Sequence, residues 1–131
     1  MSGAEDVLDL SECLARFITI PRNIRSDGTV RPDALYPYSW VELSVTRHHG
    51  LTEAMVWQRG EVVAAEMQKP LVGRADLETY VFQSQGLRVI STPQPENTNH
   101  ADAIDWPIVK HDQKEIAIEI AVFAAYVKKF D

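Results

Sequence analysis

Four histidines are the side chains in this sequence that could transfer a proton near neutral pH. His48 and His49 are adjacent, and His100 shortly precedes Asp102. An imidazole with a carboxylate beside it can act as a general acid or base. Imidazole and carboxylate are also ligands for metals such as zinc. The candidates for chemistry are therefore His48, His49, His100 and Asp102.

The same spacing is also common in proteins whose histidines have no catalytic role. Adjacent side chains on an extended chain point to opposite faces, so only one of His48 and His49 would enter a shared site. A histidine near an aspartate occurs often by chance. We therefore expect loop histidines bonded to backbone, carboxylate or water, with no metal and no cofactor. An acid–base enzyme is the alternative.

The sequence lacks the short motifs that define common active sites. It contains no GxxxxGK(S/T) or GxGxxG phosphate loop, no GxSxG nucleophile turn and no HExxH zinc motif. Cys13 is the only cysteine, which excludes an internal disulfide and zinc sites built on several cysteines. We expect this thiol to be partly buried and inert. These absences favour a protein that is not an enzyme.

An arginine-rich segment interrupts an otherwise acidic chain. The whole chain has 13 basic and 19 acidic residues, for a net charge of −6. Between positions 16 and 31, however, the four charged side chains besides Asp27 are all arginines. With the predicted turn at Asp27-Gly28, Arg22, Arg25 and Arg31 could clamp a phosphate or carboxylate, or contact an acidic partner. The overall acidity argues against nucleic acid as a partner.

Aromatic residues follow the arginine segment at every second position. Tyr36, Tyr38 and Trp40 would share one face of an extended chain. Aromatic side chains beside arginine are common in protein interfaces, so this face is the predicted contact surface. The alternative is that these rings cap the edge of the core. Trp106 is interpreted as an anchor for its loop, or else as a residue that lines a binding pocket.

The chain of 131 residues is long enough for one domain with its own core. Residues 1–10 are expected to be frayed. No apolar run approaches the ~20 residues that span a bilayer, and the acidic N-terminus lacks a basic signal region. We therefore expect a cytoplasmic protein with no membrane partner.

Hydrophobic periodicity predicts alternating helices and strands. A helical turn is expected over 11–16, strands over 17–20, 40–46 and 87–91, and helices over 52–68 and 75–85. Residues 21–39 and 92–110 are predicted to be long loops. The predicted class is α+β, with a small mixed or antiparallel sheet and about three helices packed on one face as a single layer pair.

The last predicted helix begins at a cap on Asp112 and carries apolar residues on two sides. Its two stripes are Ile116, Ile120, Phe123 and Val127, and Ile118, Val122 and Ala125. A helix that is apolar on two sides either lies at the centre of the core or is shared with a partner. A homodimer through this helix is one predicted assembly.

Several short motifs together resemble a group of small bacterial proteins to which no activity is assigned. The motifs are Arg16-Phe17-Ile18 with Pro21, Arg31-Pro32-x-Ala34, Leu43-Ser44-Val45, Gly73-Arg74-Ala75-Asp76-Leu77, Gly86-Leu87-Arg88-Val89, and Asn99-His100-Ala101-Asp102-x-Ile104 with Trp106-Pro107. They span most of the chain. The resemblance implies a bacterial lineage and carries no catalytic residue over to this sequence.

The leading hypothesis is a non-enzymatic bacterial protein that binds another protein or a second copy of itself. An accessory subunit or an immunity-type neutraliser of a toxin would fit. The predicted binding residues are Arg25, Arg31, Tyr36, Tyr38, Trp40 and Trp106.

The alternative hypothesis is a small enzyme or a binder of an anionic small ligand. It requires His48 or His49 and Arg25 or Arg31 to line one pocket together with His100.

Overall fold

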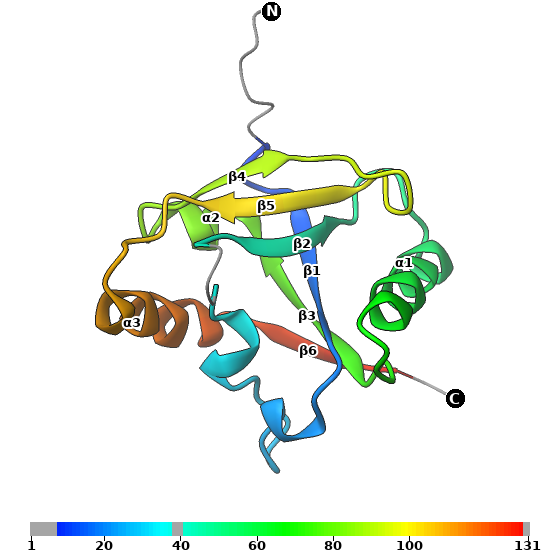
Figure 1. The fold of residues 1–131 in the computed structure, drawn as a ribbon, viewed down its shortest axis with the longest axis horizontal. Coiled ribbons are helices and arrows are strands. Elements are labelled where there is room, and N and C mark those ends of the chain that lie inside the picture. The colour runs from blue at the N-terminus through cyan, green and yellow to red at the C-terminus, as the bar shows by residue number, and fades with distance from the viewer. Residues whose placement is uncertain (1–7, 38–40, 130–131) are drawn as a thin grey trace, which may run out of the picture.

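The computed structural model describes residues 8–37 and 41–129, which form one antiparallel sheet flanked by helices (Figure 1). The strands are β1 (Cys13–Ile18), β2 (Leu43–Arg47), β3 (Gly73–Glu78), β4 (Arg88–Ser91), β5 (His100–Ile104) and β6 (Ala125–Lys128). The helices are α1 (Glu53–Glu66), α2 (Thr79–Gln83) and α3 (Lys110–Ala121), with short 3-10 turns η1 (Pro21–Asn23) and η2 (Pro32–Leu35). The predicted α+β class is confirmed. No helix in these ranges is long and apolar enough to cross a membrane.

The sheet has the strand order β4-β5-β2-β1-β3-β6. β1 pairs with β3 along its full length, from Cys13 opposite Glu78 to Ile18 opposite Gly73. Its register with β2 covers only Leu14 with Arg47 and Ala15 with Thr46. β1 and β2 therefore diverge after Ala15, near the centre of the sheet.

Arg16 spans the gap that this divergence opens. Its Nη1 donates to the carbonyl oxygen of Ser44 at 2.9 Å, and its Nε donates to the carbonyl oxygen of Ala34 at 2.9 Å. A backbone carbonyl that leaves a strand ladder pairs with another donor or with water. The guanidinium supplies one where the β1–β2 ladder has ended, and it also connects the sheet to η2.

Strand alternation separates an apolar face of the sheet from a polar one. The apolar face forms the main core with residues from η2, α2 and α3; its largest fully buried side chains include Phe82, Leu14, Ile18, Leu35, Leu43, Leu77 and Ile120. On the opposite face, the pairings place Thr46 and Asp76 beside Ala15, and Arg74 beside Phe17. Polar groups therefore gather on one side of the sheet.

The helices divide between these two faces. α3 contributes Ile120 and Ala121 to the core on the apolar face. α1 packs on the polar face, where a Cβ built on Gly60 would lie 2.7 Å from Cδ1 of Phe17. Figure 1 shows α1 and α3 on opposite sides of the sheet. The helices therefore do not all pack on one face, because each face of the sheet carries apolar groups to cover.

Some predicted elements are confirmed and others are wrong. The helix over 52–68 is α1, and the hydroxyl of Thr52 caps it by accepting from the backbone N–H of Met55 at 3.2 Å. The strands predicted over 40–46 and 87–91 overlap β2 and β4. The predicted helical turn over 11–16 is instead the start of β1, and the predicted helix over 75–85 begins inside β3. In both segments tertiary pairing overrides local helix preference.

The C-terminal half differs most from expectation. The predicted loop over 92–110 contains β5, and α3 begins at Lys110, before the expected cap at Asp112. α3 also ends at Ala121, and residues 125–128 pair with β3 as the edge strand β6. Both stripes of the predicted helix are therefore wrong beyond Ala121: Phe123 and Val127 of the first stripe and Ala125 of the second do not belong to the helix.

Replacing Gly60 with alanine tests the packing of α1. We expect Gly60→Ala to lower the free energy of unfolding by about 1 kcal/mol, because overpacking costs about 1–3 kcal/mol and alanine's helix preference returns about 1 kcal/mol. Thermal or denaturant unfolding measures it. Ala65→Gly, at an exposed position of the same helix, measures the helix-preference contribution alone. A Gly60→Ala variant more stable than the wild type would contradict the close packing on Phe17.

Candidate functional site

The predicted binding arginines lie in and beside the hairpin-like loop between η1 and η2. The Nη1 of Arg25 donates to the hydroxyl of Thr29 at 3.2 Å and to the carbonyl of Val30 at 3.4 Å. Arg25 therefore stabilises its own turn. Arg31 is exposed at the N-cap of η2, and its backbone N–H donates to the carbonyl of Asn23.

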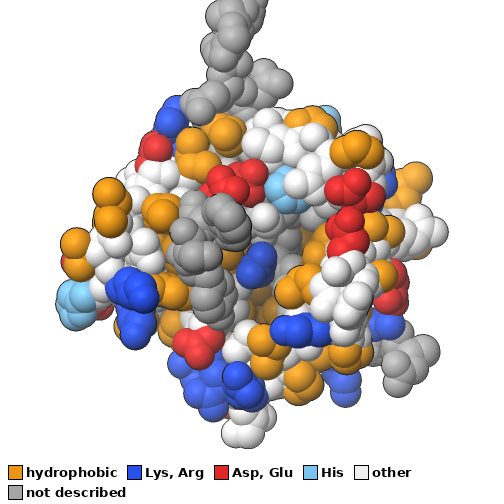
Figure 2. All heavy atoms as spheres, viewed as in Figure 1, with side chains coloured by type: hydrophobic (Ala, Val, Ile, Leu, Met, Phe, Trp, Pro, Cys, Tyr) orange, Lys and Arg blue, Asp and Glu red, His pale blue; other side chains and the backbone are white. Residues whose placement is uncertain are grey.

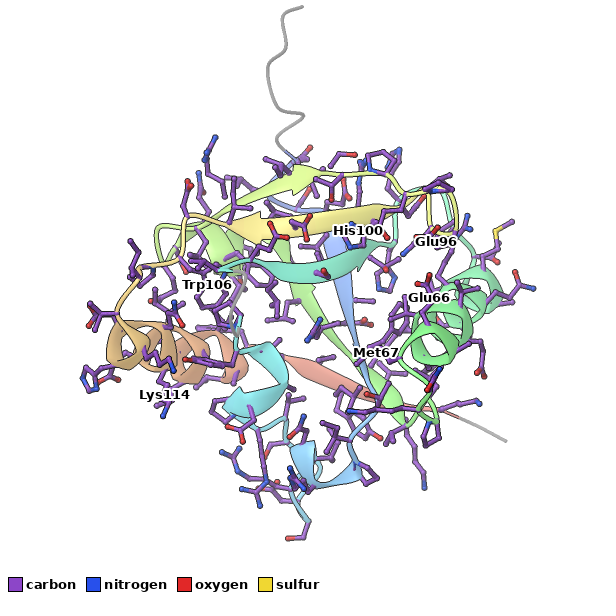
Figure 3. The ribbon with its side chains drawn as sticks, viewed as in Figure 1. Glu66, Met67, Glu96, His100, Trp106 and Lys114 are labelled. Atoms are coloured by element: carbon purple, nitrogen blue, oxygen red, sulfur yellow. The ribbon has the colours of Figure 1, made fainter. Side chains whose placement is uncertain are left out.

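The predicted aromatic surface is only partly present in the described residues. Tyr38 and Trp40 lie outside them. Tyr36 is half-buried and lines a groove of about 410 Å³ between η2 and α3, with Pro32, Lys114 and Ile118 among its other walls. Trp106 is 4% exposed, and its Nε1 donates to the carbonyl of Ala103 at 3.0 Å (labelled in Figure 3). Trp106 therefore anchors the core and is not part of an exposed contact surface.

The predicted chemical residues separate into two places. His100 and Asp102 lie on β5, and both are buried on the polar face of the sheet. His48 follows β2 and points to a different cluster beside β3. His49 is exposed, and its carbonyl accepts from Asn99. Because β5 and β3 are separated by two strands, these four residues do not form a single site.

A hydroxyl on Thr92 connects His100 to Asp102. The hydroxyl donates to Oδ2 of Asp102 at 2.9 Å and lies 2.9 Å from Nδ1 of His100. Nδ1 also lies 3.1 Å from the carbonyl oxygen of Thr92, which can only accept. The network therefore places the ring proton on Nδ1 and leaves Nε2 of the neutral ring as an acceptor.

The gap between β1 and β2 forms a cleft of about 620 Å³. His100 lines one side, and Glu66 and Met67 at the end of α1 line another (Figure 3). Arg16 and Lys69 bring positive charge, and Asp33 and Glu66 bring negative charge. The described lining includes no residue of the pair His48–His49 and neither Arg25 nor Arg31. The convergence of histidine and arginine loops that the alternative hypothesis requires is therefore not found in this cleft.

A second cluster lies on the polar face where α1 meets β3, around the buried cation of Arg74. The Arg74 side chain is 3% exposed, and its Nη1 and Nη2 donate to both carboxylate oxygens of Glu53 at 2.9 and 3.0 Å. Its Nε donates to Asp76, and the guanidinium lies over the Trp57 ring at 4.7 Å from the centroid. Arg74 thus ties the first turn of α1 to β3.

His48 extends this cluster towards the thiol of Cys13. Its Nε2 lies 3.1 Å from Oδ1 of Asp76. The hydrogen bond to Asp76 and, to a smaller extent, the one to Cys13 raise the pKa of His48 to about 9. Burial lowers this pKa but does not outweigh the two hydrogen bonds. Burial pushes the pKa of Asp76 upward, but hydrogen bonds from His48 and Arg74 bring it below its usual value. At neutral pH, His48 and Asp76 therefore form an ion pair.

Sequence reasoning missed most of this cluster. It considered His48, and Glu53 as a carboxylate that could orient a histidine, but it gave Arg74 and Asp76 no chemical role and interpreted Cys13 as inert. A signal was available: in residues 73–78, Ala75 and Leu77 alternate with charged residues, which is the pattern of a half-buried strand. Interpreting this segment as a strand would have placed Arg74 and Asp76 on one face.

Searches among protein-family models, curated proteins and solved structures found no match to this chain. Its function is therefore argued from its own geometry and charges, and the resemblance to small bacterial proteins stays a prediction.

The ion pair of His48 predicts a loss of stability at alkaline pH. The folded pKa of about 9 exceeds the ordinary value of 6.5, so the folded state holds a proton that the unfolded state releases between these values. The stabilisation is complete below pH 6.5 and disappears as pH rises through 9. We expect the free energy of unfolding to fall by about 1–3 kcal/mol across this window.

Denaturant unfolding at a series of pH values measures this loss. His48→Gln removes the titrating group and should flatten the curve between pH 6.5 and 9. His111→Gln, at an exposed histidine of α3, is the control and should keep the wild-type slope. Equal slopes in the wild type and in His48→Gln would show that the ion pair with Asp76 does not contribute.

Proposed function

We propose that this protein is a non-enzymatic protein-binding module that contacts its partner through one surface around α3. We call this the α3 surface and define it by the exposed apolar residues Ile108, Val109, Ile118, Val122 and Phe123. An accessory subunit or an immunity-type protein would use such a surface.

The observation that carries this proposal is the concentration of exposed apolar side chains near one helix. Ile108 is 88% exposed and Val122 is 75% exposed. With Val109 and Phe123, they are the four most exposed large hydrophobic side chains in residues 8–37 and 41–129. Hydrophobic side chains project from the molecule on the side where α3 lies (left in Figure 2). Clustered exposed apolar groups rimmed by polar ones typically mark protein-binding sites.

The groove beside α3 extends this surface towards η2. Tyr36 and Ile118 both line it, and Lys114 and Asp33 contribute charges of opposite sign to its walls. Interfaces commonly combine an aromatic ring and aliphatic side chains at the centre with charged groups at the rim. Tyr36, one of the predicted aromatic contact residues, thus lies in the groove beside α3. The groove and the exposed apolar residues around α3 together support one contact surface.

Charge introduced at Val122 tests the α3 surface. We expect Val122→Lys to keep the fold, because the side chain is 75% exposed and a cation suits the end of a helix. It should weaken binding at least tenfold, because it replaces a highly exposed apolar side chain of the contact surface with a charge. Met55→Lys, at a 45% exposed apolar position on α1, is the matched control.

Two measurements on these variants identify the partner. Sedimentation equilibrium determines whether the wild type self-associates, and quantitative cross-linking in a host lysate detects another protein. The proposal requires that one of these interactions is lost in Val122→Lys and retained in Met55→Lys. An interaction retained by both variants, or no interaction in either measurement, would refute it.

The cleft between β1 and β2 favours a second candidate function, binding of a small anionic ligand. Its volume of about 620 Å³ lies within the range of ligand sites. Arg16 and Lys69 line the cleft together with His100, and both cations can donate hydrogen bonds to an anion. This function needs no partner protein and no contact with the α3 surface.

Titration with inorganic phosphate, followed by amide NMR, tests the cleft. We expect phosphate to shift the signals of residues around Thr46 and His100 in the wild type, with at least tenfold weaker binding in His100→Ala. His111→Ala should bind as the wild type does. Shifts confined to the exposed arginines Arg25 and Arg31, or no saturable shift, would exclude the cleft as an anion site.

A further inference from the structure

We propose that Cys13, His48 and Asp76 form a binding site for a divalent transition metal, with zinc as the preferred ion. These three side chains belong to no part of the α3 surface or the cleft. Each offers one ligand atom, a thiol sulfur, a ring nitrogen or a carboxylate oxygen, and the three atoms all lie within 4.8 Å of one another.

The sheet itself brings the three ligands together. The backbone N–H of His48 donates to the carbonyl of Cys13 at 3.0 Å, so the residue after β2 stands opposite the first residue of β1. On the other side of β1, Asp76 pairs with Ala15. Because every second residue of a strand points to the same face, Cys13 projects with Ala15 on the polar face. The three ligands thus come from three neighbouring backbone segments held in fixed register.

The distances suit a tetrahedral ion. With bonds of about 2.0–2.3 Å, ligand atoms around zinc lie roughly 3.3–3.8 Å apart. Nε2 of His48 and Oδ1 of Asp76 are 3.1 Å apart, and no pair of the three ligand atoms exceeds 4.8 Å. A metal between them would therefore require rotation of side chains and the release of the protons held by the His48 ring and the Cys13 thiol. Thiolate, imidazole and carboxylate are also the ligand types that zinc accepts.

Neighbouring groups hold the carboxylate in place. Arg74 donates from Nε to both oxygens of Asp76 at 3.0 and 3.2 Å, and is itself fixed by Glu53 and the Trp57 ring. Such outer contacts orient ligands in known metal sites. They also balance charge: a divalent cation, Arg74, the Cys13 thiolate and the carboxylates of Glu53 and Asp76 together are electroneutral.

Three protein ligands leave one position of a tetrahedral ion open. Structural zinc sites use four protein ligands, and sites with three keep water or an exchangeable ligand in the fourth position. All three residues are partly exposed, so solvent reaches the cluster. We therefore assign this site to the open class, in which the bound ion can exchange its fourth ligand.

Titration of the full chain with Co²⁺ tests the site, because Co²⁺ replaces zinc and is coloured. We expect one equivalent of Co²⁺ to produce tetrahedral visible bands and a thiolate-to-metal absorption band, both displaced by Zn²⁺. Cys13→Ser should abolish the thiolate band, and Asp76→Asn should weaken binding at least tenfold. Circular dichroism with and without metal establishes that each variant is folded.

The control is His100→Gln, which changes the other histidine that lies beside an aspartate of the sheet. It should leave the absorption spectrum and the affinity unchanged. The proposal is overturned if the wild type shows no thiolate band with one equivalent of Co²⁺. It is also overturned if Cys13→Ser and wild type bind Zn²⁺ equally well, which would leave the cluster as an ion-pair network only.

Discussion

The ladder between β1 and β3 is the constraint on which the rest of the structure depends. It is the only pairing of β1 that runs through the whole strand, from Cys13 to Ile18, in the described part of the chain. Its register decides which side chains of both strands face the core. Leu14 and Leu77 share the apolar face as a pair, while Ala15 and Asp76 share the polar one. A shift by one residue would exchange these faces and bury charges in the main core.

The polar face is stable because its charges are paired in place. Arg74 is nearly inaccessible to solvent, and an isolated cation there would be strongly unfavourable. Glu53 from α1 and Asp76 from the same strand supply two carboxylates, and Trp57 covers the guanidinium. The same contacts dock α1 where Gly60 allows close approach to Phe17. The helix and the charge network therefore stabilise each other.

The two proposed sites use opposite faces of one sheet for different physical reasons. The α3 surface remains apolar because α3 buries only Gln113, Ala117, Ile120 and Ala121, and its other side has nothing to cover it within the described chain. In the cluster of Cys13, His48 and Asp76, two ligands lie on strands β1 and β3, and the third directly follows β2 and is tied to β1 by the hydrogen bond from its backbone N–H to the carbonyl of Cys13. An interaction surface and a metal site can thus coexist without sharing a residue.

The sequence by itself determined the α+β class, helix α1 with its cap at Thr52, and the alternation that makes β2 a half-buried strand. These features depend on residues close together in the chain. Tertiary structure alone decided that 125–128 forms an edge strand and that His48 joins Cys13 and Asp76 rather than His100. Cys13, His48 and Asp76 are far apart in the chain, and only the register of three strands brings them together. Local periodicity carries no information about that register, because it arises from pairing between distant segments.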